Sequence, residues 1–362
     1  MQGILQHVSR GGIVHVSDTN SNDPGIQRRV TVRALAKLAG VSPATVSRAL
    51  RSDNPTGDDS PGRSTVRRLA DALQYRPSYA TRAFQTGKTF TVGLLYDHFA
   101  AFSSSTYLQQ IAGILSTLRP SHYDLTIHAL DTDKAVERDL FLDHRFDGYL
   151  IANQISPDLV RAVQNAELPC VLINQESVAG LPTVRPDDVQ AGRLLTEHLL
   201  ELGHREIVFA FEHPISPQPH VSRALRWEGH VQAMRAAGLR PARIKYPNID
   251  ALVDFCLARK PRFTAIILYA ETHAPELQRR LRRFRIATPG QMSVASFNDT
   301  PLAARLDPPL TSVRIDFEAC SRKATELLLE QIGNVHAVTP LDTLIPITLV
   351  RRASTATPSD NP

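Results

Sequence analysis

The sequence predicts a small all-α helix-turn-helix headpiece followed by an α/β core of two doubly wound parallel-sheet subdomains. Three observations predict this fold class. The chain has 362 residues, which is too long for one ordinary core. A basic segment at 31–50 carries two short helical patterns separated by a glycine, and from residue 90 short apolar runs alternate with helical patterns.

Composition places the chain among soluble globular proteins, with 42% hydrophobic and 21% charged residues. No apolar run reaches the roughly 18 residues of a membrane span, and residues 1–29 lack the cationic start and apolar middle of a signal peptide. We therefore expect a cytoplasmic protein with no membrane partner. The three cysteines form no CxxC pair, which favours buried free thiols, and we expect no metal and no cofactor.

Positive charge gathers near the N-terminus, although the whole chain carries a net charge of only +5. Residues 30–89 contain ten Lys and Arg residues against four Asp residues. A basic segment on a slightly acidic body is typical of a polyanion-binding module joined to another domain. A solvated face is the alternative for such a charge cluster taken alone.

Residues 31–50 predict two helices joined by a short turn. The first apolar stripe ends at Gly40, the residue that turns most easily, and Ser42 and Pro43 suit the N-cap and first position of the second helix. The second helix leaves three polar side chains on its outer side: Thr45, Ser47 and Arg48. A third stripe at 66–73 completes a small core, and any three-helix fragment is the alternative on this pattern alone. Residues 1–29 show no periodicity and are expected to form a disordered tail.

These patterns resemble the DNA-binding headpiece of the lactose-repressor/galactose-repressor (LacI/GalR) family. Residues 31–50 are similar to its consensus sequence, T-I-x-D-V-A-x-x-A-G-V-S-x-x-T-V-S-R-x-L, and 75–77 match its Y-x-P element. The match continues through 82–87, which is similar to the family's hinge segment. Two departures are a longer loop before the third helix and Arg51 in place of the common Asn. The resemblance implies a DNA-binding domain at 30–75 and a hinge segment at 76–89.

Two series of apolar runs and helical patterns follow, at 92–174 and 187–297. This rhythm predicts parallel sheets covered on both faces, and two similar sheets in one body imply a cleft between them. Several segments are similar to sequence motifs of the same family: 197–205 to E-H-L-x-x-L-G-H-R, 226–229 to R-x-x-G, 293–299 to S-V-x-x-F-D-D and 308–313 to P-P-L-T-T-V.

The resemblance spans roughly residues 30–354 and implies a periplasmic-binding-protein-like, effector-binding and dimerisation domain at 90–350. Its first subdomain would cover about 90–184 and 315–350, and its second about 185–314, with a C-terminal tail at 351–362. In this family the chain crosses between the sheets three times. We therefore expect the helix at 316–332 and the strand near 345–350 to return to the first subdomain.

Ligands of open α/β sheets bind beyond the carboxyl ends of the strands, where this chain has several polar residues. Amides and carboxylates there can hold the hydroxyl groups of a sugar, and an Arg can hold two neighbouring oxygens. With the resemblance, this predicts effector contacts from Asp97, Phe102, Asn174, Arg226, Glu271, Asn298 and Phe317. A structural cap or a surface pair is the alternative for each residue singly. Asn replaces the family's commoner Asp at two of these positions, and 269–271 replace its A-N-D, so a standard hexose pose does not follow. We expect a sugar or a sugar derivative.

The resemblance also implies the residues that contact DNA: Thr31, Ser42, Pro43, Ala44, Thr45, Ser47, Arg48, Arg82 and Phe84. Pro43 and Ala44 occupy base-reading positions but can touch only a thymine methyl group. Arg48 can pair with a guanine, and the neighbouring hydroxyls suit phosphates. Phe84 takes the place of the hinge leucine that wedges into the minor groove, and packing on the core is its alternative.

We therefore expect a homodimeric transcriptional regulator, most simply a repressor, that binds a near-palindromic operator in double-stranded DNA and is controlled by a small carbohydrate-like effector. A transport-type sugar-binding protein is the rival, against which the basic headpiece argues. An enzyme is a weaker rival, because no G-x-S-x-G, H-E-x-x-H or complete phosphate-binding loop is present. The sequence leaves open whether the effector releases or strengthens DNA binding, and whether dimers pair further.

Overall fold

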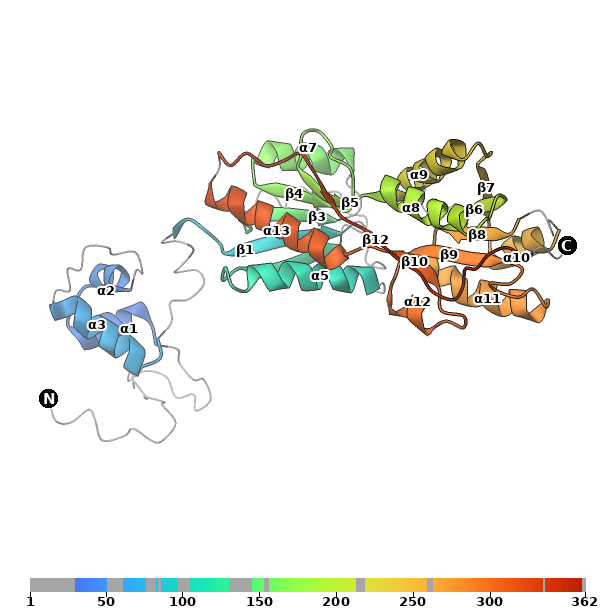
Figure 1. The fold of residues 1–362 in the computed structure, drawn as a ribbon. Coiled ribbons are helices and arrows are strands. Elements are labelled where there is room, and N and C mark those ends of the chain that lie inside the picture. The colour runs from blue at the N-terminus through green and yellow to red at the C-terminus, as the bar shows by residue number, and fades with distance from the viewer. Residues whose placement is uncertain are drawn as a thin grey trace, which may run out of the picture. The chain divides into compact units, whose positions relative to one another are not determined.

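A computed structural model of the chain describes residues 30–50, 61–75, 83, 86–96, 105–129, 145–152, 156–212, 219–258, 263–334 and 336–359. It contains two compact units, residues 1–89 and 90–362 (Figure 1). The expected tail at 1–29 and most of the expected hinge lie outside the described residues. So do four candidate site residues: Arg82, Phe84, Asp97 and Phe102.

The first unit contains three short helices, α1 (Val32–Ala39), α2 (Pro43–Ala49) and α3 (Pro61–Ala72). Their apolar faces meet in one small core, as the periodicity predicted: Leu35, Ala36, Val46, Ala49, Val66 and Ala70. The turn between α1 and α2 depends on Gly40, whose φ of +65° is left-handed and costs glycine no steric strain. Ser42 then caps α2, because its hydroxyl accepts the Thr45 N–H at 3.2 Å.

The second unit begins with a six-stranded parallel sheet in the order β11-β5-β4-β3-β1-β2. Its strands are β1 (Thr91–Tyr96), β2 (Asp124–Ala129), β3 (Gly148–Ala152), β4 (Cys170–Ile173), β5 (Thr183–Pro186) and β11 (Asp342–Ile345). Helices α5 (Ser105–Leu118) and α13 (Phe317–Gly333) pack on one face, and α7 (Pro157–Ala166) packs on the other (Figure 1). Successive side chains of β1 point to opposite faces of the sheet, so Leu94 packs against α5 and α13 whereas Leu95 packs against α7.

A second six-stranded sheet repeats this plan in the order β12-β10-β9-β8-β6-β7. Its strands are β6 (Ile207–Glu212), β7 (Ala242–Tyr246), β8 (Ala265–Leu268), β9 (Ser293–Asn298), β10 (Thr311–Arg314) and β12 (Thr348–Val350). Helices α8 (Asp188–Glu201) and α9 (Ser222–Ala236) cover one face, and α10 (Ile249–Ala258) and α11 (Ala274–Arg283) cover the other. The short η2 (Glu271–His273) and α12 (Pro301–Arg305) follow β8 and β9. Both sheets are doubly wound, which confirms the predicted fold class.

The last two strands differ from the prediction that the strand near 345–350 belongs to the first subdomain. β11 pairs with β5 in the first sheet, but β12 pairs antiparallel with β10 in the second sheet. Pro346 follows β11 directly, and proline has no N–H with which to continue a ladder. The described residues of 90–186 and 317–345 therefore form the first subdomain, and those of 188–314 and 348–359 form the second.

The first two crossings between the subdomains have the same local structure. Asp187 follows β5 and caps α8, and Asp316 follows β10 and caps α13. Their φ and ψ angles are −77° and 81° at Asp187, and −85° and 81° at Asp316. Each carboxylate accepts a backbone N–H of the first helical turn, at 2.9 Å and 2.7 Å respectively. A strand, an Asp cap and a helix thus carry the chain across in both directions.

The C-terminal segment is anchored on the second sheet, in contrast to the tail expected at 351–362. The Ser354 N–H donates to the Pro309 carbonyl at 3.0 Å, and its hydroxyl accepts the Thr311 N–H at 2.8 Å. His204, from the G-H-R segment, lies with Nε2 2.9 Å from the Ala356 carbonyl oxygen. Burial lowers the pKa of His204, so the ring serves as a neutral bridge to this segment.

Two further expectations concern cysteines and membranes. Cys170, Cys256 and Cys320 are free and buried, as predicted. Within the described ranges, no helix has both the length and the apolar character needed to cross a bilayer. In the same ranges, no three His, Cys, Asp or Glu side chains gather as potential metal ligands.

Helices α8 and α9 pack unusually closely through two glycines. A Cβ atom at Gly192 of α8 would overlap the Arg226 carbonyl oxygen, and one at Gly229 of α9 would overlap the Val189 carbonyl oxygen. Gly113 makes the same kind of contact in the first subdomain, where a Cβ atom would overlap the Glu318 carbonyl oxygen of α13. The glycine of the R-x-x-G segment is therefore a packing residue.

We expect Gly229→Ala to lower the free energy of unfolding by about 1–3 kcal/mol, because the new methyl group forces α8 and α9 apart. Gly333→Ala is the matched control, since a Cβ atom there meets nothing within 4 Å, and it should change stability by less than about 0.5 kcal/mol. Urea unfolding followed by circular dichroism measures both. Equal stability of the two variants would show that α8 and α9 can separate without cost.

Candidate nucleic-acid interface and ligand site

Helix α2 presents one polar face to solvent. Ser42, Pro43, Ala44 and Arg48 are exposed, and Thr45 and Ser47 are half-buried. Val46 and Ala49 of the same helix are buried in the three-helix core. The structure therefore brings the expected DNA-contacting residues of α2 onto a single accessible surface, as the periodicity predicted.

The hydroxyl groups that cap α1 and α2 already have partners within the headpiece but keep hydrogen-bonding capacity. Thr31 caps α1 by accepting the Ala34 N–H at 3.2 Å, which leaves its hydroxyl hydrogen available. The Ser42 and Thr45 hydroxyls lie 3.0 Å apart, so one donates to the other and one hydrogen remains. Each pair can thus still donate to a phosphate oxygen.

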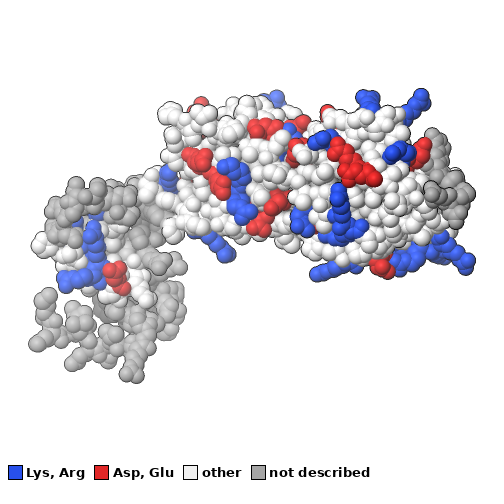
Figure 2. All heavy atoms as spheres, viewed as in Figure 1, with Lys and Arg blue, Asp and Glu red and all other residues white. Residues whose placement is uncertain are grey.

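The described part of this unit is strongly basic. Residues 30–50 and 61–75 contain one acidic residue, Asp71, against six cations: Arg33, Lys37, Arg48, Arg63, Arg67 and Arg68 (Figure 2). Arg67 donates through Nε to the Ala49 carbonyl at 3.1 Å, which satisfies the C-terminal end of α2. Arg48 donates through Nε to the Ala44 carbonyl at 3.4 Å and has no other partner among the described residues. Its terminal amino groups are therefore available to an external acceptor.

Two of the predicted ligand residues stand at the carboxyl ends of strands in a strained backbone conformation. Asn174 follows β4 with φ +59°, and Asn298 ends β9 with φ +83°. Asparagine is enriched among the non-glycine residues that adopt positive φ. The backbone thus gives a physical reason for Asn at both positions.

Arg226 and Asn298 are brought together, as expected for residues of one site. Arg226 Nη2 donates to Asn298 Oδ1 at 3.3 Å, and its guanidinium carbon lies 4.7 Å from the Phe297 ring centroid. Arg226 is also held by a residue that sequence analysis missed, because its Nε donates to Asp188 Oδ1 at 2.7 Å. Both side chains of this ion pair are at most 5% exposed. The two residues are 38 positions apart, and no local pattern joins them.

A chain of hydrogen bonds connects Asn174 in the first subdomain to the second. The His220 Nε2–H donates to the Asn174 carbonyl oxygen at 2.7 Å, which leaves Nδ1 as an acceptor. The Ser222 hydroxyl lies 2.8 Å from that Nδ1 and 2.9 Å from the Tyr269 hydroxyl. The Ser222 N–H also donates to Nδ1 at 3.2 Å, so the direction of donation runs from Tyr269 through Ser222 to His220. Sequence analysis identified none of these three residues.

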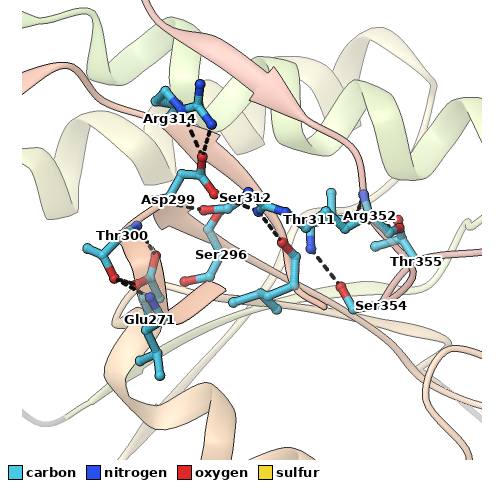
Figure 3. Close-up of polar contacts among 12 residues, drawn as sticks. Glu271, Ser296, Asp299, Thr300, Thr311, Ser312, Arg314, Arg352, Ser354 and Thr355 are labelled. Carbon is cyan, nitrogen blue, oxygen red and sulfur yellow. Dashed lines mark hydrogen bonds and ion pairs between the residues drawn. The ribbon is translucent and has the colours of Figure 1, made fainter. Parts of the chain in front are cut away.

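Glu271 corrects the prediction of a ligand contact. Its side chain is buried, and it accepts the Thr300 N–H at 3.1 Å and the Thr300 hydroxyl (Figure 3). Burial raises the pKa of the carboxyl, and the Thr300 hydrogen bonds act in the opposite direction. This carboxylate holds the N-cap of α12, and each of its two oxygens already accepts a hydrogen bond within the protein. Phe317, at the start of α13, is buried in the first subdomain.

Asp299, the acid after Asn298, joins three segments of the second sheet. Arg314 at the end of β10 contacts one carboxylate oxygen at 2.7 Å, and Arg352 of the C-terminal segment contacts the other at 2.5 Å (Figure 3). The Asp299 side chain is 1% exposed, so its ion pairs with Arg314 and Arg352 form where the carboxylate is shielded from water. The acid of the F-N-D segment therefore fixes the chain around the site.

Comparison with known proteins adds the following matches. Residues 196–355 match the model of a periplasmic binding protein-like domain. The HTH-type transcriptional regulator GntR of Pseudomonas aeruginosa is 28% identical over 330 residues, which is 88% of this chain and 92% of the relative. The HTH-type transcriptional regulator GalS of Salmonella typhimurium is 27% identical over 344 residues, with 90% and 97% covered.

Solved structures share the fold over most of the chain. The lac repressor dimer bound to operator and the anti-inducer ONPF has a TM-score of 0.76 at 21% identity, covering 91% of this chain and 100% of that one. The complex of the transcriptional regulator CelR with cellobiose has a TM-score of 0.63 at 24% identity, covering 90% and 100%.

We expect Arg226→Gln to lower the free energy of unfolding by about 3–5 kcal/mol, because Asp188 is left as a buried, unpaired charge. Adding Asp188→Asn should recover part of this loss, since the double variant buries no net charge. Arg193→Gln is the control, because its pair with Glu197 is about half exposed and should contribute less than about 1 kcal/mol. A loss no larger than that of the control would contradict the role given to this ion pair.

Proposed function

Because the chain belongs to the LacI/GalR family of transcriptional regulators, we propose that it binds a near-palindromic operator as a homodimer and responds to a small carbohydrate-like effector. The observation that carries this proposal is the exposed polar face of α2 in a basic three-helix unit, joined to a two-sheet unit. The relatives matched are regulators, in agreement with the expectation that the chain is not an enzyme.

On DNA, α2 lies in the major groove with Arg48 on a guanine edge, and Pro43 and Ala44 contribute at most methyl contacts. The hydroxyl groups beside α2 bind phosphates: Thr31, Ser42, Thr45 and Ser47. Arg82 and Phe84, which lie outside the described residues, would enter the minor groove. Two headpieces on two half-sites require a dimer, and sedimentation velocity tests it through a species of twice the chain mass.

We expect Arg48→Ala to weaken binding to an operator selected from a random DNA library by about 1–3 kcal/mol and to relax selectivity at one base pair per half-site. Fluorescence anisotropy with the selected operator and its single-pair variants measures both effects. Arg235→Ala removes the same charge from an exposed site in the second unit and should leave operator affinity unchanged. Unchanged affinity of Arg48→Ala would contradict the assignment of α2.

The effector would bind beyond the carboxyl ends of the strands, between the two subdomains. Asn298 uses its oxygen for Arg226, so its amide N–H groups remain to donate to a ligand oxygen. Arg226 is oriented for the same task by Asp188. Asn174 and Phe317 would contribute from the first subdomain, together with Asp97 and Phe102, whereas Glu271 is excluded by its contacts with Thr300. The sugar complexes of the structural relatives, with cellobiose and with ribose, support this ligand class.

A panel of sugars that begins with cellobiose and ribose should contain a ligand that changes operator affinity by about 5- to 150-fold. Asn298→Ala should remove this response and leave operator affinity without sugar unchanged, because the headpiece is untouched. Asn334→Ala, at the end of α13, is the matched control and should respond like the wild type. Anisotropy titrations with and without sugar measure the effect. A response that survives Asn298→Ala would place the ligand elsewhere.

A further inference from the structure

A pocket lies in the second subdomain, between the start of α9 and the edge strand β7, and its lining includes His220, which bonds the Asn174 carbonyl of the proposed effector site. Its volume is about 260 Å³, slightly below the roughly 300 Å³ at which ligand pockets usually begin. Its walls include three apolar side chains, Phe211, Val221 and Trp227, and three cations, Arg223, Arg243 and Lys245. Among the described residues, no carboxylate lines it.

Positive charge in this pocket has no counterpart in the described part of the chain. Arg243 and Lys245 are exposed on the same face of β7, two residues apart, where like charges repel. Neither forms an ion pair with any described carboxylate. Arg223 donates to the Glu212 carbonyl, a neutral acceptor, and keeps its charge beside the pocket. An anion placed between these groups would remove the repulsion.

The apolar wall is aromatic and lies directly beneath the cations. The Arg243 guanidinium carbon is 5.2 Å from the Trp227 ring, and that of Arg223 is 5.2 Å from the centre of the Phe211 ring. Guanidinium groups over aromatic rings leave their N–H edges free for a carboxylate. Charges on an edge strand also prevent edge-to-edge pairing, but that role needs neither a pocket nor an aromatic wall.

We propose that this pocket binds a small aromatic carboxylate. The ring of the ligand lies along the apolar wall, beside the guanidinium groups that cover the Trp227 and Phe211 rings, and its carboxylate is held by Arg243 and Lys245. Such a ligand matches both surfaces of the pocket, whereas a free inorganic anion uses only the cations and a neutral ring uses only the aromatic wall. The regulator would thus carry a ligand site separate from the one between its subdomains.

The test uses the full-length protein and four probes: benzoate, benzamide, cyclohexanecarboxylate and inorganic phosphate. Trp227 is the only tryptophan in the chain, so its fluorescence reports on this wall directly, and calorimetry gives the dissociation constants. Benzoate should bind about 10-fold or more tightly than benzamide, because the amide lacks the charge. Phosphate and cyclohexanecarboxylate should also bind more weakly than benzoate. No benzoate binding at millimolar concentration, or binding of benzamide or phosphate as tight as that of benzoate, overturns the proposal.

Paired charge variants locate the site. Arg243→Gln with Lys245→Gln should weaken benzoate binding about 10-fold or more. Arg235→Gln with Arg240→Gln removes two exposed charges outside the pocket and should have no effect. Circular dichroism confirms that each variant is folded, and equal benzoate affinity of the two double variants overturns the proposal. Asn298→Ala should keep benzoate binding, which separates this result from the sugar response.

Discussion

The ion pair between Asp188 and Arg226 is the interaction on which the second subdomain depends. Asp188 lies in the first turn of α8, immediately after the chain leaves the first sheet, and Arg226 lies in α9. Two buried charges are tolerated only when they are paired, and this pairing requires the close helix contact that Gly192 and Gly229 allow. Arg226 then reaches Asn298 at the end of β9. This single ion pair thus holds together the first crossing, the two helices α8 and α9, and the end of β9.

Sequence analysis predicted those parts of the fold that local periodicity determines. The helix-turn-helix with its Gly40 turn and Ser42 cap, and most of the buried strands, follow from apolar patterns read over a few residues. β7 was missed because its residues alternate between exposed cations and partly buried side chains, without an apolar run. Partner choice could not be predicted either, since Asp188 and Glu271 are engaged by groups that only the tertiary fold brings close. The candidate site at the strand ends therefore stays a prediction, and one of its members, Glu271, is engaged within the second subdomain by Thr300.

Several segments that resemble family motifs hold the fold together around the candidate site. His204 and Asp299 both bind the C-terminal segment, one through the Ala356 carbonyl and the other through Arg352. The glycine of the R-x-x-G segment permits helix packing, while its arginine faces Asn298. The motifs shared within a family thus combine residues suited to contact a ligand with residues that hold those contacts in place. Each has to be assigned from its own contacts.

The short third crossing limits how the two subdomains can move. Only Pro346 and Ile347 separate β11 from β12, and an extended chain spans at most about 3.3–3.6 Å per residue. The other two crossings are also short, and in each of them an Asp residue caps the helix that follows the strand. Sheets joined in this way can rotate about their connections but cannot slide far apart. Connector length therefore bounds the movement between the two sheets, and it can change by insertion or deletion while the residues proposed to contact DNA and ligand stay the same.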